Sequence, residues 1–124
     1  MAVTTTTASN PLVTTVAVDG AADIVVESID DGNNNVYAVE IINPNTSAVY
    51  IHMMNQAASS NSTTSTQHDH QLYCGAGSSC YYYWPEGYKT AAGIQVYCSD
   101  AAGGGQTASS PTEAVTLTFG FTAR

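Results

Sequence analysis

The sequence predicts an all-β protein, a single antiparallel β-sandwich of about eight strands with a jelly-roll-like arrangement. Three observations lead to this prediction. Apolar and polar residues alternate with a period of two in segment after segment, and no long stretch has the 3.6-residue period of an amphipathic helix. Turn residues interrupt the chain about every 8–12 residues. The length of 124 residues is typical of one domain with one hydrophobic core.

The clearest strand is EAVTLTFGFT, residues 113–122. Every second residue from Val115 to Phe121 is apolar, and threonine or glycine stands between them. Successive side chains of a strand point to opposite faces, so this segment should be a central strand with one face in the core. The other expected strands are LVTTVAV (12–18), ADIVVESI (22–29), NVYAVEIIN (35–43), SAVYIHMM (47–54), TQHDHQLY (66–73), CYYYW (80–84) and GIQVYCS (93–99).

Turn and loop signals separate these strands. NPNT, residues 43–46, has the length and composition of a hairpin turn between its two flanking strands. The sandwich domain is expected to span residues 12–124, and the threonine-rich residues 1–11 form an N-terminal arm that either reaches a neighbour or frays. The remaining expected turns and loops are DG (19–20), DDGNNN (30–35), NQAASSNSTTS (55–65), GAGSS (75–79), PEG (85–87) and AAGGGQTASSP (101–111).

The charge of the chain excludes several classes of partner. Lys89 and Arg124 are the only basic side chains against ten acids, and the formal net charge is −8. Such a chain has almost nothing with which to neutralise nucleic-acid phosphates or an anionic membrane surface. The N-terminus shows neither a basic region nor an apolar run, and no stretch is long and apolar enough for a membrane span, so synthesis in a cytoplasm is expected.

The segment HDHQLYCGAGSSCYYYW, residues 68–84, holds the residues with the most chemistry. His68 and His70 share one face of the expected strand, so both imidazoles could meet one metal ion, with His52 as a further ligand. The His-x-His pair is similar to the motif with which trimeric phage fibre and spike tips hold iron on a threefold axis. The alternative is a polar, exposed strand face beside a loop.

The three cysteines cannot all pair within one chain. Cys74 and Cys80 flank a five-residue spacer that could close into a disulfide, whereas buried free thiols are the alternative. Cys98 alternates with Ile94 and Val96 and is expected in the core.

Alternation places Tyr81 and Tyr83 on one strand face and Tyr82 and Trp84 on the other. One pair can fill the core while the other stays at the surface as a protein–protein interface, and packing under a loop is the alternative. DDGNNN lacks the downstream glutamate of a calcium loop and is expected to be a turn. No motif for a nucleophile, a phosphate loop or a catalytic triad is present, so we expect no enzyme activity and no cofactor.

From about residue 35 to the end, the order of these signals resembles small β-sandwich structural proteins of tailed bacteriophages. The resemblance lies in NVYAVEIINPNTSAVYIHMMN, then WPEGYKTAAGIQVYCSDAAGGG, then the final EAVTLTFGF strand. It implies a virion protein, made in the host cytoplasm, that binds the major capsid protein or other virion proteins and forms a homo-oligomer. A capsid decoration (cement) protein is the first expectation. A neck, tail or fibre accessory protein, with a host- or glycan-binding role, is the alternative.

Overall fold

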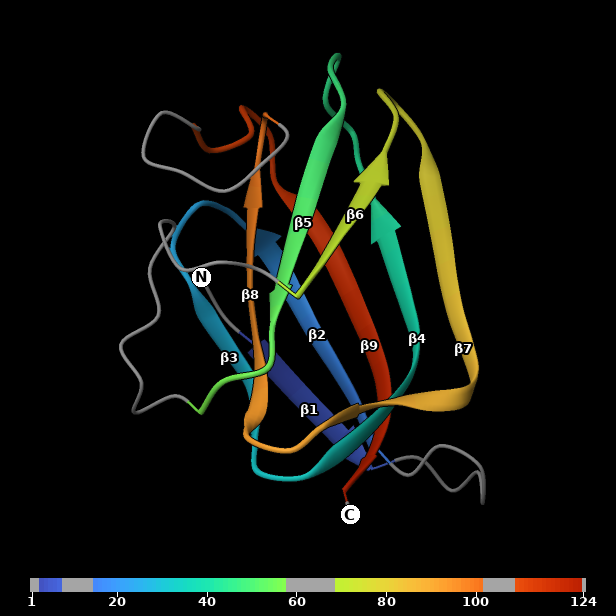
Figure 1. Ribbon diagram of the computed structural model, residues 1–124. Coiled ribbons are helices and arrows are strands. Elements are labelled where there is room, and N and C mark those ends of the chain that lie inside the picture. The colour runs from blue at the N-terminus through green and yellow to red at the C-terminus, as the bar shows by residue number, and fades with distance from the viewer. Residues whose placement is uncertain (1–2, 8–14, 58–68, 102–108, 124) are drawn as a thin grey trace.

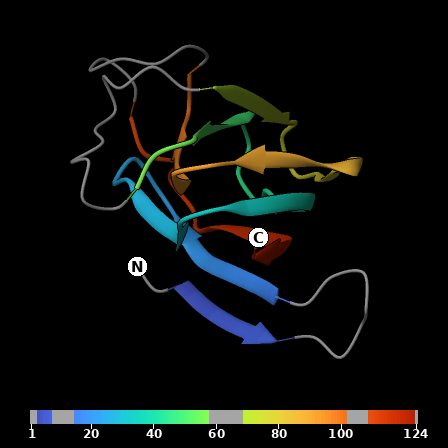
Figure 2. The same ribbon diagram turned by 60° about the horizontal axis from the view of Figure 1, so that its bottom comes forward.

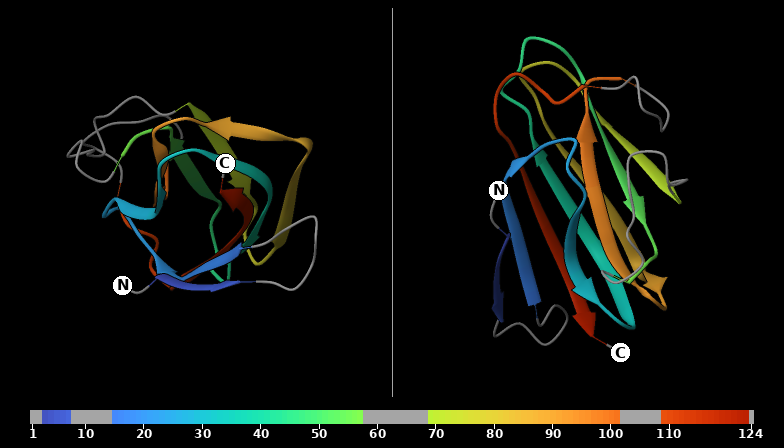
Figure 3. Two further views of the ribbon diagram at one scale, coloured as in Figure 1. Left: turned by 90° about the horizontal axis from the view of Figure 1, so that it is seen from below. Right: turned by 90° about the vertical axis from the view of Figure 1, so that its left-hand side faces the viewer.

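The computed structural model describes residues 3–7, 15–57, 69–101 and 109–123, and in these residues it contains β-strands and no helix. The strands form two antiparallel sheets that face each other (Figures 1 and 3). The strands are β1 (Val3–Thr7), β2 (Thr15–Ala22), β3 (Glu27–Asp31), β4 (Asn34–Ile42), β5 (Val49–Met54), β6 (His70–Cys74), β7 (Ser79–Thr90), β8 (Gly93–Ser99) and β9 (Val115–Ala123). The all-β sandwich predicted from the sequence is confirmed.

The strand order is that of a jelly roll, with one additional edge strand. One sheet has the order β1-β2-β9-β4-β7, and the other has the order β3-β8-β5-β6. β2 pairs with β9, β3 with β8, β4 with β7 and β5 with β6. The chain therefore behaves as one long hairpin rolled into two sheets, and the strands alternate between the sheets except at β5 and β6.

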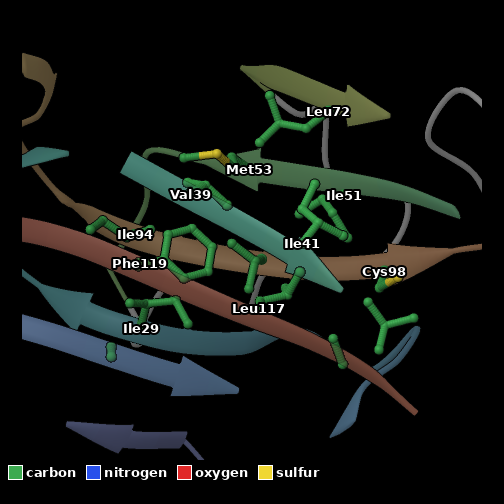
Figure 4. Close-up of a cluster of buried hydrophobic side chains, with 14 of the residues drawn as sticks. Ile29, Val39, Ile41, Ile51, Met53, Leu72, Ile94, Cys98, Leu117 and Phe119 are labelled. Carbon is green, nitrogen blue, oxygen red and sulfur yellow. The ribbon is translucent and has the colours of Figure 1, made fainter. Parts of the chain in front are cut away.

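The core lies between the two sheets and consists of the inward residues of each strand (Figure 4). In β9 the residues at positions 115, 117, 119 and 121 are all buried, as the alternation of the sequence predicts. Phe119 is paired with Val39 of β4 on one side and with Ala17 of β2 on the other, so it stands in the middle of the five-stranded sheet. Burial of such alternating faces is the main force that holds the sandwich together.

NPNT does not close a hairpin, contrary to the sequence prediction. β4 belongs to the five-stranded sheet and β5 to the four-stranded sheet, so residues 43–48 cross from one sheet to the other. Two buried asparagines organise this crossing. The side-chain amide of Asn43 donates to the carbonyls of Ser47 and Gly75, each at 3.0 Å, and Asn45 exchanges two hydrogen bonds with the backbone of Glu113. Three connections at the same end of the sandwich are thereby tied together (Figure 1, top).

Several further segments differ from the sequence prediction. DG, residues 19–20, is expected as a turn but lies inside β2, where the register with β9 shifts between Asp19 and Ala22. Val3–Thr7, expected in an N-terminal arm, form β1 and pair along their length with β2 (Figure 2). The rest of the expected arm lies outside the described residues, as do residues 58–65 of the expected polar loop. PEG, expected as a turn, lies inside β7, where Trp84–Gly87 form a bulge opposite Tyr37. Gly87 has a φ of 81°, and a Cβ there would meet the ring of Tyr37 at 3.2 Å, so glycine is required at this bend.

The outer face of the four-stranded sheet is also buried at several residues that alternation alone would place in solvent. Four residues on this face are at most 3% exposed: Met54, Gln95, Tyr97 and Ser99. His52 lies on the same face and has no solvent exposure. The Nε2 of His52 lies 2.8 Å from the hydroxyl of Ser99, which itself donates to the carbonyl of Ala101. The His52 ring also stacks on Tyr97 with centroids 4.3 Å apart. His52 is therefore part of a packed layer.

Candidate docking face

The candidate site lies on β7, an edge strand of the five-stranded sheet. Its first half, Ser79–Trp84, pairs with β4 on one side only and carries neither a charged residue nor a proline. Tyrosine and tryptophan favour extended strands, and their alternation here decides which rings enter the core. An uncharged aromatic stretch is unusual at a sheet edge, because proteins commonly protect such edges with charges or prolines, as the second half of β7 does with Pro85, Glu86 and Lys89.

Tyr81 and Tyr83 project from the outer face of the sheet. Their side chains are 55% and 66% exposed, and their rings are nearly parallel with centroids 6.3 Å apart. The neighbouring β4 contributes Ile42, which is 42% exposed, and the small Ala38 opposite Tyr83. We call Tyr81, Tyr83 and Ile42 the outer tyrosine face. Exposed aromatic and aliphatic side chains side by side are typical of protein-binding surfaces.

Glu40 fixes one end of this face. It stands opposite Tyr81 in the ladder between β4 and β7, and its carboxylate accepts a hydrogen bond from the Tyr81 hydroxyl. This hydrogen bond, together with the negative charge of Glu40, raises the pKa of Tyr81. Tyr81 therefore stays protonated at physiological pH, and the hydrogen bond to Glu40 restricts the orientation of its ring. A ring held in place before binding loses less conformational entropy when a partner covers it.

Tyr82 and Trp84 point to the opposite side of β7 and pack against the core. The Tyr82 hydroxyl donates a hydrogen bond to the carbonyl of Tyr73 and accepts one from the backbone N–H of Tyr73 at 3.0 Å. These two bonds connect β7 to β6 across the open side of the sandwich. The four aromatic residues 81–84, all of them candidates for an interface, therefore separate into an exposed pair and a core-facing pair. The alternation of the sequence predicts this separation.

The proposed metal ligands do not all face the same way. His70 pairs with Met53 and faces the core side, where its ring packs edge-on against Tyr88 at 4.4 Å and near Trp84. His52, adjacent to Met53 in the strand, projects from the other face of the same sheet, so His52 and His70 cannot share one ion. His68 lies outside the described residues, and the two-histidine site remains a prediction. Among the described residues, no three histidine, cysteine, aspartate or glutamate side chains are grouped to hold a metal ion.

The bend of β7 forms an open depression of about 410 Å³ lined by Trp84, Pro85, Glu86 and Gly87. It borders the inward-facing aromatic cluster of His70, Trp84 and Tyr88.

In the part of the chain that the structure describes, no helix is long and apolar enough to cross a membrane.

A buried acid, Asp19, stands on the inner side of β2 with no solvent exposure. Its Oδ1 accepts a hydrogen bond from the N–H of Ala21 at 3.2 Å, whereas Oδ2 is buried without a hydrogen-bond partner. Burial raises the pKa of Asp19, and the negative charges of Glu27 and Asp23 act in the same direction. A raised pKa in the folded state means that ionisation of Asp19 at neutral pH opposes folding.

We therefore expect Asp19→Asn to unfold at a higher denaturant midpoint than the original chain at pH 7. The folding contribution of the neutral carboxyl is complete below the unfolded-state pKa and is lost as pH rises through the folded-state pKa. The difference in denaturant midpoint between the Asp19→Asn variant and the original chain should accordingly narrow as the pH falls towards about 4, the ordinary pKa range of an aspartate. Urea unfolding from pH 4 to 8 measures this, with Glu86→Gln, an exposed acid, as the control. A difference in midpoint that widens at low pH would contradict a raised pKa of Asp19.

Comparison with known proteins finds little similarity. No protein-family model matches the chain, and no curated protein matches it. One solved structure that is similar to it is described as "Bacillus endospore appendages form a novel family of disulfide-linked pili". The similarity covers 99% of this chain and 88% of that one, at 13% sequence identity and a TM-score of 0.39. A similarity of this degree is too distant to transfer a function.

Proposed function

We propose that this protein is a structural subunit that acts by binding other protein subunits through the outer tyrosine face, and that it is a capsid decoration (cement) protein of a tailed bacteriophage. The observation that carries the docking role is the parallel, exposed Tyr81–Tyr83 pair on the uncharged first half of the edge strand β7. Tyrosine is enriched among the residues that dominate binding energy, and it offers a large contact area at low entropic cost.

The assignment to a phage particle rests on the sequence pattern described above and is supported by the kind of fold. The jelly roll is a recurrent fold of viral capsid proteins, although a fold by itself does not determine a function. The proposed role requires no catalysis and no cofactor, because it consists of surface buried at subunit junctions. A decoration protein repeats the same contact many times on a symmetric shell, so a modest affinity per copy is sufficient.

The proposed partner is the major capsid protein or another virion protein, and the proposed location is the particle. The net charge of −8 favours a partner surface that is neutral or basic where the two proteins meet. The outer tyrosine face places few charges at the contact. Among the β4 residues that pair with Ser79–Tyr83, Glu40 alone is charged, and its carboxylate accepts a hydrogen bond from Tyr81.

The test uses the purified double variant Tyr81→Ser/Tyr83→Ser. It is mixed with capsid shells that lack this protein, prepared from the phage that encodes it. Loss of two hot-spot rings at about 2 kcal/mol or more each should weaken binding to the shells by about 1,000-fold. Co-sedimentation measures the affinity. The stability of the variant should change little, because both rings are exposed.

The matched control is Val25→Ser, which removes an apolar side chain that is 58% exposed but lies between β2 and β3, away from β7. It should bind the shells like the original chain. Unchanged binding of the double tyrosine variant, or an equal loss in the Val25 variant, would rule out the outer tyrosine face as the docking site.

A further inference from the structure

We propose that Cys74 and Cys80 are an oxidisable pair whose disulfide joins the two sheets of the sandwich beside the docking strand. Cys74 is the last residue of β6 in the four-stranded sheet, and Cys80 is the second residue of β7 in the five-stranded sheet. β6 and β7 are not paired in a ladder, so this bond would connect layers that hydrogen-bonded strands do not connect here. The inference goes beyond the proposed docking function and does not depend on it.

The backbone places the two residues next to each other. The Cys74 Sγ lies 3.8 Å from the carbonyl oxygen of Ile41, and Ile41 is the ladder partner of Cys80. The same sulfur lies 3.3 Å from the carbonyl of Ser78, two residues before Cys80. The two thiols are also close enough to hydrogen-bond each other. Both are free in this structure, and a disulfide would form between neighbouring side chains.

The turn between the two cysteines is built to keep them together. Gly77 adopts a φ of 62°, and its N–H donates to the carbonyl of Asn45 at 2.9 Å. The Asn43 side chain holds the carbonyls of Cys74 and Gly75 from the other side. A disulfide needs its two Cβ atoms at close range and correctly directed, and a fixed turn maintains such a geometry.

The third cysteine is a poor partner. Cys98 lies in β8, where its ladder partner is Ile51, and it is fully buried in the core. Burial, with the nearby charges of Asp19 and Asp23, raises the pKa of its thiol to about 12. β5 lies between β8 and β6 in the sheet, so Cys98 and Cys74 are separated by two strand spacings, about 10 Å, which is too far for a disulfide. Cys98 is therefore the internal control for the other two.

The proposed oxidant is a small-molecule disulfide such as glutathione disulfide. The Cys80 thiolate, which is partly exposed, attacks one sulfur and releases one glutathione, so that Cys80 carries a mixed disulfide. Cys74 loses its proton, its thiolate attacks the Cys80 sulfur, and the second glutathione leaves as a thiolate that takes up that proton. The protein loses two thiol hydrogens and one glutathione disulfide becomes two glutathiones, so atoms and electrons balance.

The second step has a distinctive pH dependence. Burial raises the pKa of Cys74 above its ordinary value, and this cause persists when Cys80 is a mixed disulfide, so only a small fraction of Cys74 is thiolate at neutral pH. Well below this pKa the thiolate fraction rises about tenfold per pH unit. Closure of the mixed disulfide should therefore accelerate about tenfold from pH 7 to pH 8.

The experiment treats the folded full chain with glutathione disulfide, quenches it in acid, alkylates the remaining thiols and maps the peptides by mass spectrometry. We expect the three thiols of the reduced chain to fall to one, Cys98, with a cross-linked peptide joining Cys74 to Cys80. Three remaining thiols, a lasting glutathione adduct on Cys80, or a link to Cys98 or to a second chain would each overturn the proposal.

Two variants make the result specific. Cys98→Ala should still form the bond, whereas Cys80→Ser should retain two thiols under the same treatment. If Cys98→Ala does not fold, the peptide map of the original chain answers the question alone. Oxidised chain should also unfold at a higher temperature than reduced chain, because the bond restricts the unfolded state. An oxidised form that is equally or less stable would contradict the inter-sheet role of the bond.

Discussion

Phe119→Ala is expected to destabilise the protein by about 3–5 kcal/mol, the usual cost of removing a buried phenylalanine ring. The Phe119 side chain has no solvent exposure, and its strand β9 is paired on both sides, with β2 and with β4. The paired strands fix its neighbours in place, so the core cannot collapse into the space that the ring leaves. Single domains have a free energy of unfolding of about 5–15 kcal/mol, so this loss takes a large share of it.

Equilibrium unfolding in urea measures this change as a lower midpoint with an unchanged slope. Thr118→Ala is the matched control, because Thr118 is the preceding residue of the same strand and faces outward. It should change the free energy of unfolding by no more than about 0.5 kcal/mol. A Phe119 variant as stable as the Thr118 variant would contradict the position of the core between the sheets.

Asn43→Ala is expected to cost about 2–4 kcal/mol, although Asn43 belongs to a turn and not to the hydrophobic core. Its side chain bonds to the carbonyls of Ser47 and Gly75, and its Oδ1 accepts from both the backbone and the side chain of Asn45. Each buried group that loses its only partner costs about 1–3 kcal/mol. Alanine removes the donor and the acceptor at once and loosens three connections at this end of the sandwich.

The free energy of unfolding again measures the effect, with Thr46→Ala as the control, because Thr46 is exposed in the same connection. A loss confined to a few tenths of a kcal/mol in the Asn43 variant would show that the crossing between the sheets is held by packing alone. The Asn43 variant should also weaken the turn that carries Cys74 and Cys80, since the same amide group holds it.

Much of this fold follows from alternation in the sequence. The period of two in residues 115–121 predicts which side chains of β9 are buried, and the same rule separates Tyr81 and Tyr83 from Tyr82 and Trp84. Alternation is informative there because each strand has one face against the core and one against solvent. The number and spacing of such strands favour a sandwich, and the rolled pairing of β2–β9 is one of the few ways to close it.

The errors occur where alternation is not informative. NPNT is a good turn sequence, but no local signal shows whether the next strand returns to the same sheet or crosses to the other. That choice depends on contacts that Asn45 makes with Glu113, 68 residues away in the sequence. The threonine run of Val3–Thr7 has no apolar face that would predict a strand, yet it forms β1 by pairing with β2. His52 was considered as a ligand, whereas a packed layer covers it on the outer face of its sheet.

The candidate site was predicted only in part. The aromatic strand and its two faces can be identified from the sequence, because they are local features. The contribution of Ile42 and Glu40 could not be, since it depends on the register between β4 and β7. The proximity of Cys74 and Cys80 is indicated by their spacing, but their position on different sheets is known only from the topology.

The most direct test of the proposed function is the copy number of this chain in purified particles of the phage that encodes it. Quantitative mass spectrometry against the major capsid protein measures that number. A decoration protein is expected at a ratio comparable to the capsid subunit, and the Tyr81→Ser/Tyr83→Ser variant should be strongly depleted in particles assembled with it. A copy number far below that of the capsid subunit would contradict the decoration role and favour the neck, tail or fibres. Complete absence from particles would contradict the assignment to the virion.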